Sequence, residues 1–253
     1  DLCINNNIDF IITPHDVSIL PFLDQIEIKA IKIGSGEAGN YDFIEHCFEF
    51  TDHIIYSTGL STIEDINNVN QIARKKRKNL SILHCNTSYP TDDNDVNLAV
   101  IGKFKSLYPN CLIGYSDHTP DHFACVSAIA SGAKIIERHI TLEKNIPNAQ
   151  DWKVSSLPSE LKILRKDLDR AYTQLGNEEK YITNAAKENI YWACKSPYAS
   201  ANLDKGEILN KEAYEMKRPY TGTKLEDIKK FENIGKLNKK IKYGEKISLA
   251  DFL

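Results

Sequence analysis

Two histidines are the residues whose type and spacing most clearly suggest chemistry. His118 ends the segment GYSDH at 114–118, and His139 lies in the segment ERHIT at 137–141. If the apolar stretches before them are neighbouring parallel strands, both imidazoles lie at the same edge of the sheet. Neutral imidazoles with water or carboxylate ligands suit divalent ions such as Mn²⁺, Zn²⁺ or Co²⁺. One such histidine alone is more often structural, whereas the pair favours a metal site.

A second group of polar residues suggests an anion site. It has one ammonium and four hydroxyls at the ends of apolar stretches, namely Lys32, Thr13, Ser35, Ser57 and Ser116. Such groups can surround the oxygens of a phosphate. Any one of the serines could instead cap a helix. The lysine is harder to explain as structural, because a charge inside a barrel is costly unless an anion meets it.

Several residues keep two interpretations. Lys32 could form a Schiff base, as in aldolases that use no metal, although the paired histidines would then have no role. Glu37, Asp117 and Asp151 could be catalytic acids or bases, or carboxylates at the start of a helix. Tyr89 precedes a proline, which restrains the local chain and can direct the tyrosine at a ligand.

The elements that must position these residues form a repeating pattern. Apolar stretches alternate with amphipathic helical patterns, and the stretches are centred at Ile12, Ile33, Ile55, Leu83, Ile113 and Ile136. This order predicts parallel strands joined by right-handed crossovers. Helices are expected at 62–77, 121–131 and about 159–175, the first opened by a capping box from Ser61 to Glu64. We therefore expect an α/β protein with a TIM-type barrel, of which six of the eight units are present.

The composition also divides the chain into segments. Residues 1–176 carry the barrel pattern, 177–189 are polar as expected of a linker, and 190–253 have short apolar pieces separated by turn signals. The last segment is predicted to be a small, mostly β module that can act as a lid. Because the chain begins with Asp1 and its first helix-like stretch follows no strand, we expect it to be the remainder of a longer chain.

Composition and charge argue against several classes of function. The chain has 253 residues and a formal net charge of −3, which gives no electrostatic footprint for nucleic acid or an anionic membrane. No apolar stretch approaches the ~20 residues of a membrane span, and no signal peptide opens the chain. The six cysteines include no Cys-x-x-Cys pair, which is typical of reduced thiols in the cytoplasm.

Seven motifs make the chain resemble the N-acetylneuraminate (sialic acid) synthase family: KIGSGE, YSTGLST, HCNTSYPT, DVNLA, GYSDHT, ERHIT and KRPYTGT. The resemblance covers essentially the whole chain. It implies a β/α barrel followed by a small β-rich antifreeze-like (SAF) domain, in a domain-swapped homodimer. Two motifs depart from the family pattern, because PNAQD replaces PGPD and Tyr220 stands where glycine is usual. These departures leave the acceptor sugar open.

The resemblance implies roles for individual residues. His118 and His139 become the ligands of Mn²⁺, with Mg²⁺ or Co²⁺ as alternatives. Lys32 and the four hydroxyls bind the phosphate and carboxylate of phosphoenolpyruvate, and Glu37 lies beside the reacting carbons. The residues implied near the sugar are Thr87, Tyr89 and Asp151, joined by Arg218 from the SAF domain of the partner subunit.

The implied reaction is the condensation of phosphoenolpyruvate with N-acetylmannosamine or a related N-acylated amino sugar, with release of phosphate. One alternative is another phosphoenolpyruvate-dependent sugar-acid synthase that uses a phosphorylated sugar. It would need a second cationic cluster, and the strand ends offer none. The other alternative is an inactive carbohydrate-binding or ice-binding relative, which would not need the paired histidines.

Overall fold

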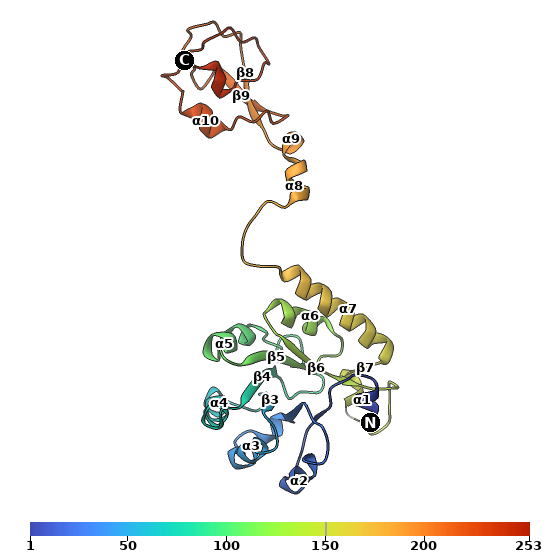
Figure 1. The fold of residues 1–253 in the computed structure, drawn as a ribbon. Helices are drawn as coiled ribbons and strands as arrows, with labels where there is room; N and C mark the ends of the chain where they lie inside the picture. Colours follow the sequence, from blue (N-terminus) through green and yellow to red (C-terminus); the bar gives the residue numbers. More distant parts are fainter. Residues whose placement is uncertain (150) are drawn as a thin grey trace. The chain divides into compact units, whose positions relative to one another are not determined.

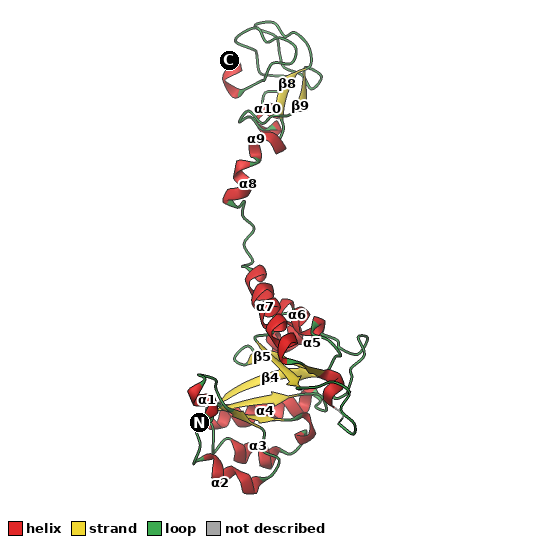
Figure 2. Ribbon diagram, turned by 90° about the vertical axis from the view of Figure 1, so that its right-hand side faces the viewer, coloured by secondary structure: helices red, strands yellow, loops and turns green. Residues whose placement is uncertain are grey.

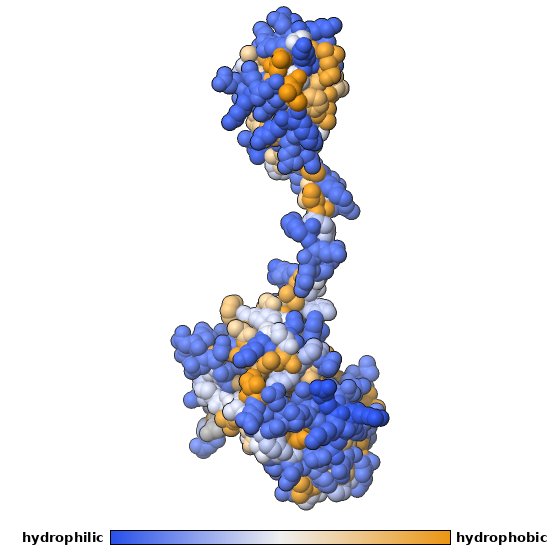
Figure 3. Space-filling model, turned by 90° about the vertical axis from the view of Figure 1, so that its left-hand side faces the viewer, coloured by the Kyte–Doolittle hydropathy of each residue, from blue (hydrophilic) through white to orange (hydrophobic). Residues whose placement is uncertain are grey.

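The computed structural model describes residues 1–149 and 151–253. The chain forms two compact units, Asp1–Asn177 and Glu178–Leu253 (Figure 1). On the face shown in Figure 3, hydrophilic residues predominate on both units and hydrophobic residues occur in patches. None of the helices in the described residues combines the length and apolar character needed to cross a membrane.

The first unit is built on one curled, parallel sheet with the strands in chain order. The strands are β1 (Ile11–Ile12), β2 (Ala30–Ile33), β3 (His53–Ser57), β4 (Asn79–Cys85), β5 (Leu112–Asp117), β6 (Ile135–Ile140) and β7 (Ser155–Ser156). Each predicted strand centre falls inside one of the first six strands, which confirms that part of the prediction. The seventh strand was not expected, because two serines give no apolar pattern. The result is a half-barrel of the α/β class.

Helices follow most of the strands (Figure 2). They are α1 (Leu2–Asn5), α2 (Leu20–Leu23), α3 (Tyr41–Cys47), α4 (Ile63–Lys76), α5 (Ala99–Leu107), α6 (Phe123–Ala130) and α7 (Pro158–Leu175), with short 3₁₀ turns at Val17–Ile19, Ser35–Glu37 and Asp151–Val154. Helix α4 does open with a capping box, but Thr62 and Asp65 form it. The predicted box one residue earlier was wrong, because Thr62 rather than Ser61 adopts the N-cap position.

The outer face of the sheet carries the main hydrophobic core. Alternate side chains of a strand point to opposite faces, and those of β2 to β5 that point outward join residues of α3 to α6 in one buried cluster. Its strand members are Ile31, Ile33, Ile54, Tyr56, Leu80, Ile82, Ile113 and Tyr115, and its helix members include Ile44, Ile66, Val69, Ile101 and Ala128. Each large apolar side chain buried in this way contributes about 1.5–3 kcal/mol.

The inner face begins with a small apolar layer. Ala30, Ile55 and Leu83 form it together with Ile135. Gly114 belongs to the same level, because a Cβ atom there would lie 2.6 Å from the carbonyl oxygen of Ile135 and would also meet the Leu83 side chain. We call these five residues the lower inner layer. They close the space below the polar residues described next.

The second unit has a core of its own. Its elements are α8 (Asn184–Glu188), α9 (Ile190–Ala193), β8 (Ser196–Ala199), β9 (Tyr214–Lys217), α10 (Leu225–Lys229) and a 3₁₀ turn at Leu249–Asp251. Strands β8 and β9 pair antiparallel. The buried cluster consists of Ala199, Leu203, Leu209, Ala213, Ile228, Leu237, Ile241, Ile247 and Phe252. A compact module is thus built from loops, short helices and two short strands.

Candidate functional site

One step further along each strand, the inner face changes from apolar to polar. Two residues beyond the members of the lower inner layer come Lys32, Ser57, Cys85, Ser116 and Glu137, which we call the middle inner layer. Since the side-chain period of a strand is two, these five residues share the inner face. Four of them are buried, while the side chain of Glu137 is 37% exposed. The layer places hydroxyls, a thiol and two opposite charges at one level.

Glu137 joins two of the predicted anion-binding residues. The ammonium of Lys32 lies 3.4 Å from Oε2 of Glu137 and donates to the carbonyl of Ile33 at 3.2 Å. The hydroxyl of Ser116 donates to Oε1 of the same carboxylate at 3.0 Å. Sequence reasoning did not select Glu137. Counting two residues on from Ile135 and two back from His139 would have found it, since all three then share one face.

Ser57 carries a buried polar atom without a partner. Its residue is 2% exposed, and its Oγ makes no hydrogen bond in the described part of the chain. A buried hydroxyl left unsatisfied costs about 1–3 kcal/mol. Such an atom beside a buried ammonium indicates a place for a polar ligand.

Above this layer, the side chains of Ser35 and Thr87 both lie close to Gly59. The amide of Gly59 donates to Oγ of Ser35 at 3.0 Å. A Cβ atom on Gly59 would lie 2.8 Å from Oγ of Ser35 and would collide with Oγ1 of Thr87. The loops after β2, β3 and β4 therefore meet at this glycine. Two of the predicted substrate-binding side chains are brought together there.

The two predicted metal ligands face each other. The ring centroids of His118 and His139 are 5.1 Å apart. Nδ1 of His118 lies 2.7 Å from the carbonyl oxygen of Asn86; because a carbonyl only accepts, this geometry assigns the ring proton to Nδ1 and leaves the lone pair on Nε2. Burial lowers the pKa of His118, and the hydrogen bond to Asn86 opposes that shift. The ring is therefore neutral at neutral pH, as a metal ligand must be.

Tyr89 and Asp151 complete the surroundings of the histidines. The Tyr89 ring stacks on His118 with centroids 4.0 Å apart and meets the His139 ring edge-on at 5.8 Å. Burial raises the pKa of Tyr89 to about 12, so the phenol keeps its proton. Oδ2 of Asp151 lies 3.4 Å from Nδ1 of His139. Tyr89 and Asp151, two of the residues predicted near the sugar, thus lie beside the imidazole pair.

The donor set fits a divalent ion held by few protein ligands. The imidazoles supply two nitrogen donors, and the carbonyl of Asn86 fixes the tautomer of one of them, which is the usual arrangement around metal-binding histidines. No cluster of three or more histidine, cysteine, aspartate or glutamate side chains with metal-binding geometry occurs in residues 1–149 and 151–253. Water or substrate oxygens would have to fill the remaining positions.

Of the other candidate residues, Glu37 and Asp117 point away from this group, Thr13 follows β1 on the inner face at the level of Lys32, and Arg218 belongs to the second unit. Glu37 accepts a hydrogen bond of 2.7 Å from Asn40 of its own turn, and Thr13 lies exposed just after β1. Arg218 is in the second unit, where its Nε donates to the carbonyl of Ala193 at 2.8 Å. Asp117 points outward, so its interpretation as a catalytic acid or base was wrong. The strand alternation that directs His118 inward directs its neighbour away from the site.

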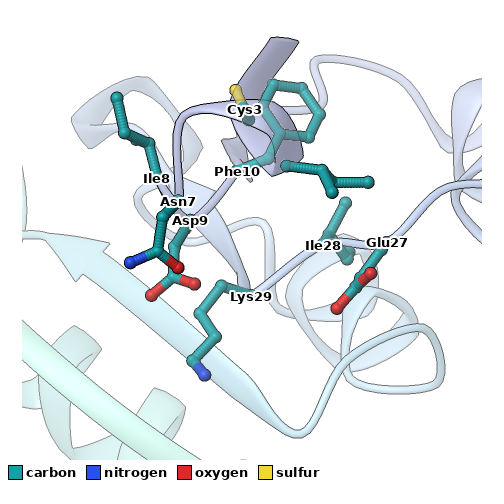
Figure 4. A pocket seen from close by; sticks show the side chains of 9 residues that line it. Cys3, Asn7, Ile8, Asp9, Phe10, Glu27, Ile28 and Lys29 are labelled. Atoms are coloured by element: carbon teal, nitrogen blue, oxygen red, sulfur yellow. The ribbon is translucent and has the colours of Figure 1, made fainter. Parts of the chain in front are cut away.

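A separate hollow lies at the amino ends of β1 and β2, away from the strand ends that carry the histidines. Figure 4 shows the side chains around it. They are Cys3, Ile4, Asn7, Ile8, Asp9, Phe10, Glu27, Ile28 and Lys29. In parallel α/β sheets ligands bind at the carboxyl ends of the strands. The candidate site is therefore the histidine end of the sheet and not this hollow.

Comparison with known proteins shows the family of this chain. Residues 1–180 match the NeuB family. The chain belongs to the NeuB family. It is 34% identical to N,N'-diacetyllegionaminic acid synthase of Campylobacter jejuni over 219 residues, which are 85% of this chain and 65% of that protein. It is 30% identical to the human N-acetylneuraminate-9-phosphate synthase, with 80% of this chain and 56% of that protein covered.

A solved structure is also similar to this chain. The sialic acid synthetase of Leptospira borgpetersenii, crystallised with citrate, superposes with a TM-score of 0.68 and 34% identity. The match covers 74% of this chain and 65% of that one. The chain thus spans less than two thirds of the length of these relatives.

Proposed function

We propose that this NeuB protein condenses phosphoenolpyruvate with N-acetylmannosamine or a related N-acylated amino sugar and releases phosphate, so that it makes a nonulosonic acid. Its relatives are named as synthases of such acids. The observation that carries the proposal is the middle inner layer, where a buried ammonium on β2 and an unpartnered buried hydroxyl on β3 lie on the same inner face as the facing imidazoles of β5 and β6. An anion and an aldehyde can be held side by side in such a site.

The anion-binding part of the site is Lys32 with the hydroxyls of Ser35, Ser57, Ser116 and Thr13. Lys32 meets Glu137 at 3.4 Å, which is longer than the usual 2.7–2.9 Å of a charge-assisted hydrogen bond. The ammonium therefore remains available to a phosphate or carboxylate. In this arrangement the Oγ of Ser57 gains an oxygen of the bound anion as its hydrogen-bond partner. These contacts hold the phosphate in place while bonds form elsewhere, which is catalysis by positioning and by charge stabilisation.

His118 and His139 would hold a divalent ion, with Mn²⁺ as our choice. When bound, such an ion polarises the aldehyde oxygen of the open-chain sugar. The chain's own groups orient the reactants. The Asn86 carbonyl fixes the His118 tautomer, and the stacked Tyr89 ring covers one side of that imidazole. Thr87 and Asp151 are exposed, and we assign the sugar to the space beside them.

The proposed condensation forms a carbon–carbon bond and breaks the bond between carbon and the phosphate oxygen. The methylene carbon of phosphoenolpyruvate attacks the aldehyde carbon, and the aldehyde oxygen takes up a proton. Water adds to the cationic carbon left behind and loses one proton, which balances the proton taken up by the aldehyde oxygen. The carbon–oxygen bond to phosphate then breaks, the remaining hydroxyl proton leaves with the phosphate, and a ketone remains. Glu137 is the carboxylate nearest to Lys32 and Ser116, so we assign the proton from the attacking water to Glu137 rather than to Glu37.

The second unit is proposed to be the SAF domain, acting in a domain-swapped homodimer. In that arrangement Arg218 of one subunit serves the site of its partner. Mixing His118→Ala subunits with Arg218→Ala subunits tests this directly, because a swapped heterodimer has one site with both defects and one intact site. Recovered turnover supports the swap. Turnover as low as that of either variant alone rejects it.

The function itself is tested by phosphate release. The full-length protein is incubated with phosphoenolpyruvate, Mn²⁺ and separate acceptors: N-acetylmannosamine, its phosphorylated form, a diamino dideoxy sugar and a phosphorylated aldose without an acylamino group. We expect release only with acylamino acceptors. Release with the last acceptor alone would favour another sugar-acid synthase. Sugar binding without release, unchanged in His118→Ala, would favour an inactive carbohydrate-binding relative.

A further inference from the structure

A buried ion pair lies behind the two histidines. Asp117 precedes His118 and Arg138 precedes His139, so strand alternation directs both side chains to the outer face. Their Cα atoms are register partners in β5 and β6. Nη1 of Arg138 lies 2.5 Å from Oδ2 of Asp117, and the two side chains are 4% and 0% exposed. Two opposite charges are thus held inside the outer layer, one residue before each imidazole.

Arg138 ties three strand ends together. Its Nε donates to Oγ of Ser156 in β7 at 3.1 Å. Its Nη1 also donates to the carbonyl of Thr119 at 2.7 Å, and Nη2 reaches the carbonyl of Pro120 at 3.3 Å. Because the guanidinium is a rigid planar fork, these contacts fix the ends of β5, β6 and β7 relative to one another.

Asp117 fixes the chain on the other side of His118. Its Oδ1 accepts from the amide of Thr119 at 2.9 Å and from the Thr119 hydroxyl at 2.8 Å. The Tyr115 hydroxyl reaches the same oxygen at 3.1 Å, and the Cys125 thiol reaches Oδ2 at 3.0 Å. The residues on both sides of His118 are therefore anchored through one carboxylate.

Stability alone does not explain such a pair. Burying two charges costs several kcal/mol per ion, so a buried ion pair adds little net stability compared with apolar residues. We propose that Asp117 and Arg138 are positioning residues that set the separation and orientation of the His118 and His139 imidazoles, and thereby the affinity of the site for a divalent ion. This inference rests on the metal site of the proposed function.

The test separates positioning from stability with a double variant. Asp117→Asn or Arg138→Met alone leaves one buried charge unpaired, whereas Asp117→Asn/Arg138→Met removes both charges and recovers much of the thermal stability. We expect all three variants to bind Mn²⁺ about tenfold more weakly, as is usual when groups supporting metal ligands are lost. The visible absorption of bound Co²⁺, which reports ligand geometry, should shift in each. Calorimetry on the protein without substrates gives the affinities.

Ile66→Ala serves as the destabilised control, since Ile66 is buried in the outer core on α4 and touches neither residue of the pair. It should keep the affinity and the Co²⁺ spectrum of the unaltered protein. A folded double variant with unchanged affinity and spectrum would overturn the positioning role alone. An unaltered protein that binds neither ion would overturn the metal site, and the inference with it. In that second outcome, His118→Ala would bind Mn²⁺ and Co²⁺ no differently from the unaltered protein.

Discussion

The two faces of the parallel sheet carry different kinds of side chain. Outward from β3 the side chains of Ile54 and Tyr56 are fully buried against helices, whereas the next residue inward, Ser57, carries an oxygen without a partner. On β5, Tyr115 belongs to the outer core and Ser116 contacts Glu137. Neighbours in sequence thus belong to separate environments. The apolar contacts that stabilise the fold therefore lie mainly on the outer face, and the polar groups of the candidate site lie on the inner face.

The largest effect should come from the inner face, at His118. His118→Ala removes one of the two proposed metal donors, and the loss of several kcal/mol of charge stabilisation corresponds to roughly a thousandfold or more in turnover. Phosphate release measures it. His84→Gln is the matched control, because His84 lies on the outer side of β4 and contacts the carbonyl of Val96. Equal losses of turnover in both variants would show that the inner and outer faces do not differ in their effect on catalysis.

The outer face should respond in stability instead. Ile82 is fully buried in the outer core, so Ile82→Ala should lower the free energy of unfolding by about 2–5 kcal/mol through the cavity that it leaves. Urea unfolding measures the loss. Turnover per folded molecule should stay unchanged. A fall in turnover as large as that in stability would show that the outer core controls the chemistry as well.

Lys32→Met should weaken phosphoenolpyruvate binding. A hydrogen bond to a charged group contributes about 1.5–3 kcal/mol, which is roughly tenfold to a hundredfold in KM. Steady-state kinetics with varied phosphoenolpyruvate measure this. Lys78→Met is the control, because Lys78 pairs with the exposed Asp52. An unchanged KM in Lys32→Met would remove Lys32 from the anion site.

Ser57→Ala should show a smaller effect of the same kind. Loss of one neutral hydrogen bond, about 1 kcal/mol, should raise the KM for phosphoenolpyruvate severalfold. Stability should not fall, because the hydroxyl has no partner in the described structure. Thermal unfolding and kinetics are measured on the same sample. Lower stability with an unchanged KM would mean that Ser57 belongs to the fold rather than to the site.

The smallest expected effect is on the pH dependence of stability. Burial lowers the pKa of His84 from its ordinary 6.5, so below that pH the unfolded chain binds more protons than the folded one. Stability is therefore lost as the pH falls below about 6.5. His84→Gln should make this loss shallower, as urea unfolding above and below that pH would reveal. An unchanged slope would assign the effect to other histidines whose pKa is lowered by desolvation, such as the half-buried His53.

The sequence predicted the parts that depend on strand period and order. Strand centres and the meeting of His118 and His139 followed from apolar stretches and parallel topology, and the 5.1 Å between the rings confirms that meeting. Glu137 was missed because the strand was interpreted through its histidine alone. The direction of Asp117 was missed for the same reason, although alternation would have given both.

Other features required coordinates. Glu37 turns toward Asn40, a local hydrogen bond that competes with any role at the site and leaves no pattern in the sequence. Strand β7 consists of two serines paired with His139 and Ile140, so tertiary contact rather than propensity creates it. The buried pair of Asp117 and Arg138 brings together two residues 21 positions apart, and no local rule couples them.

Gly59 limits how the site can be redesigned. Any larger residue there would collide with Thr87 and crowd Ser35. The three loops around Gly59 therefore leave no space for a side chain at this position. Libraries that seek enzymes for unnatural acceptors should keep position 59 constant. They should diversify position 87 instead, where an exposed threonine can be shortened to open space without moving the backbone.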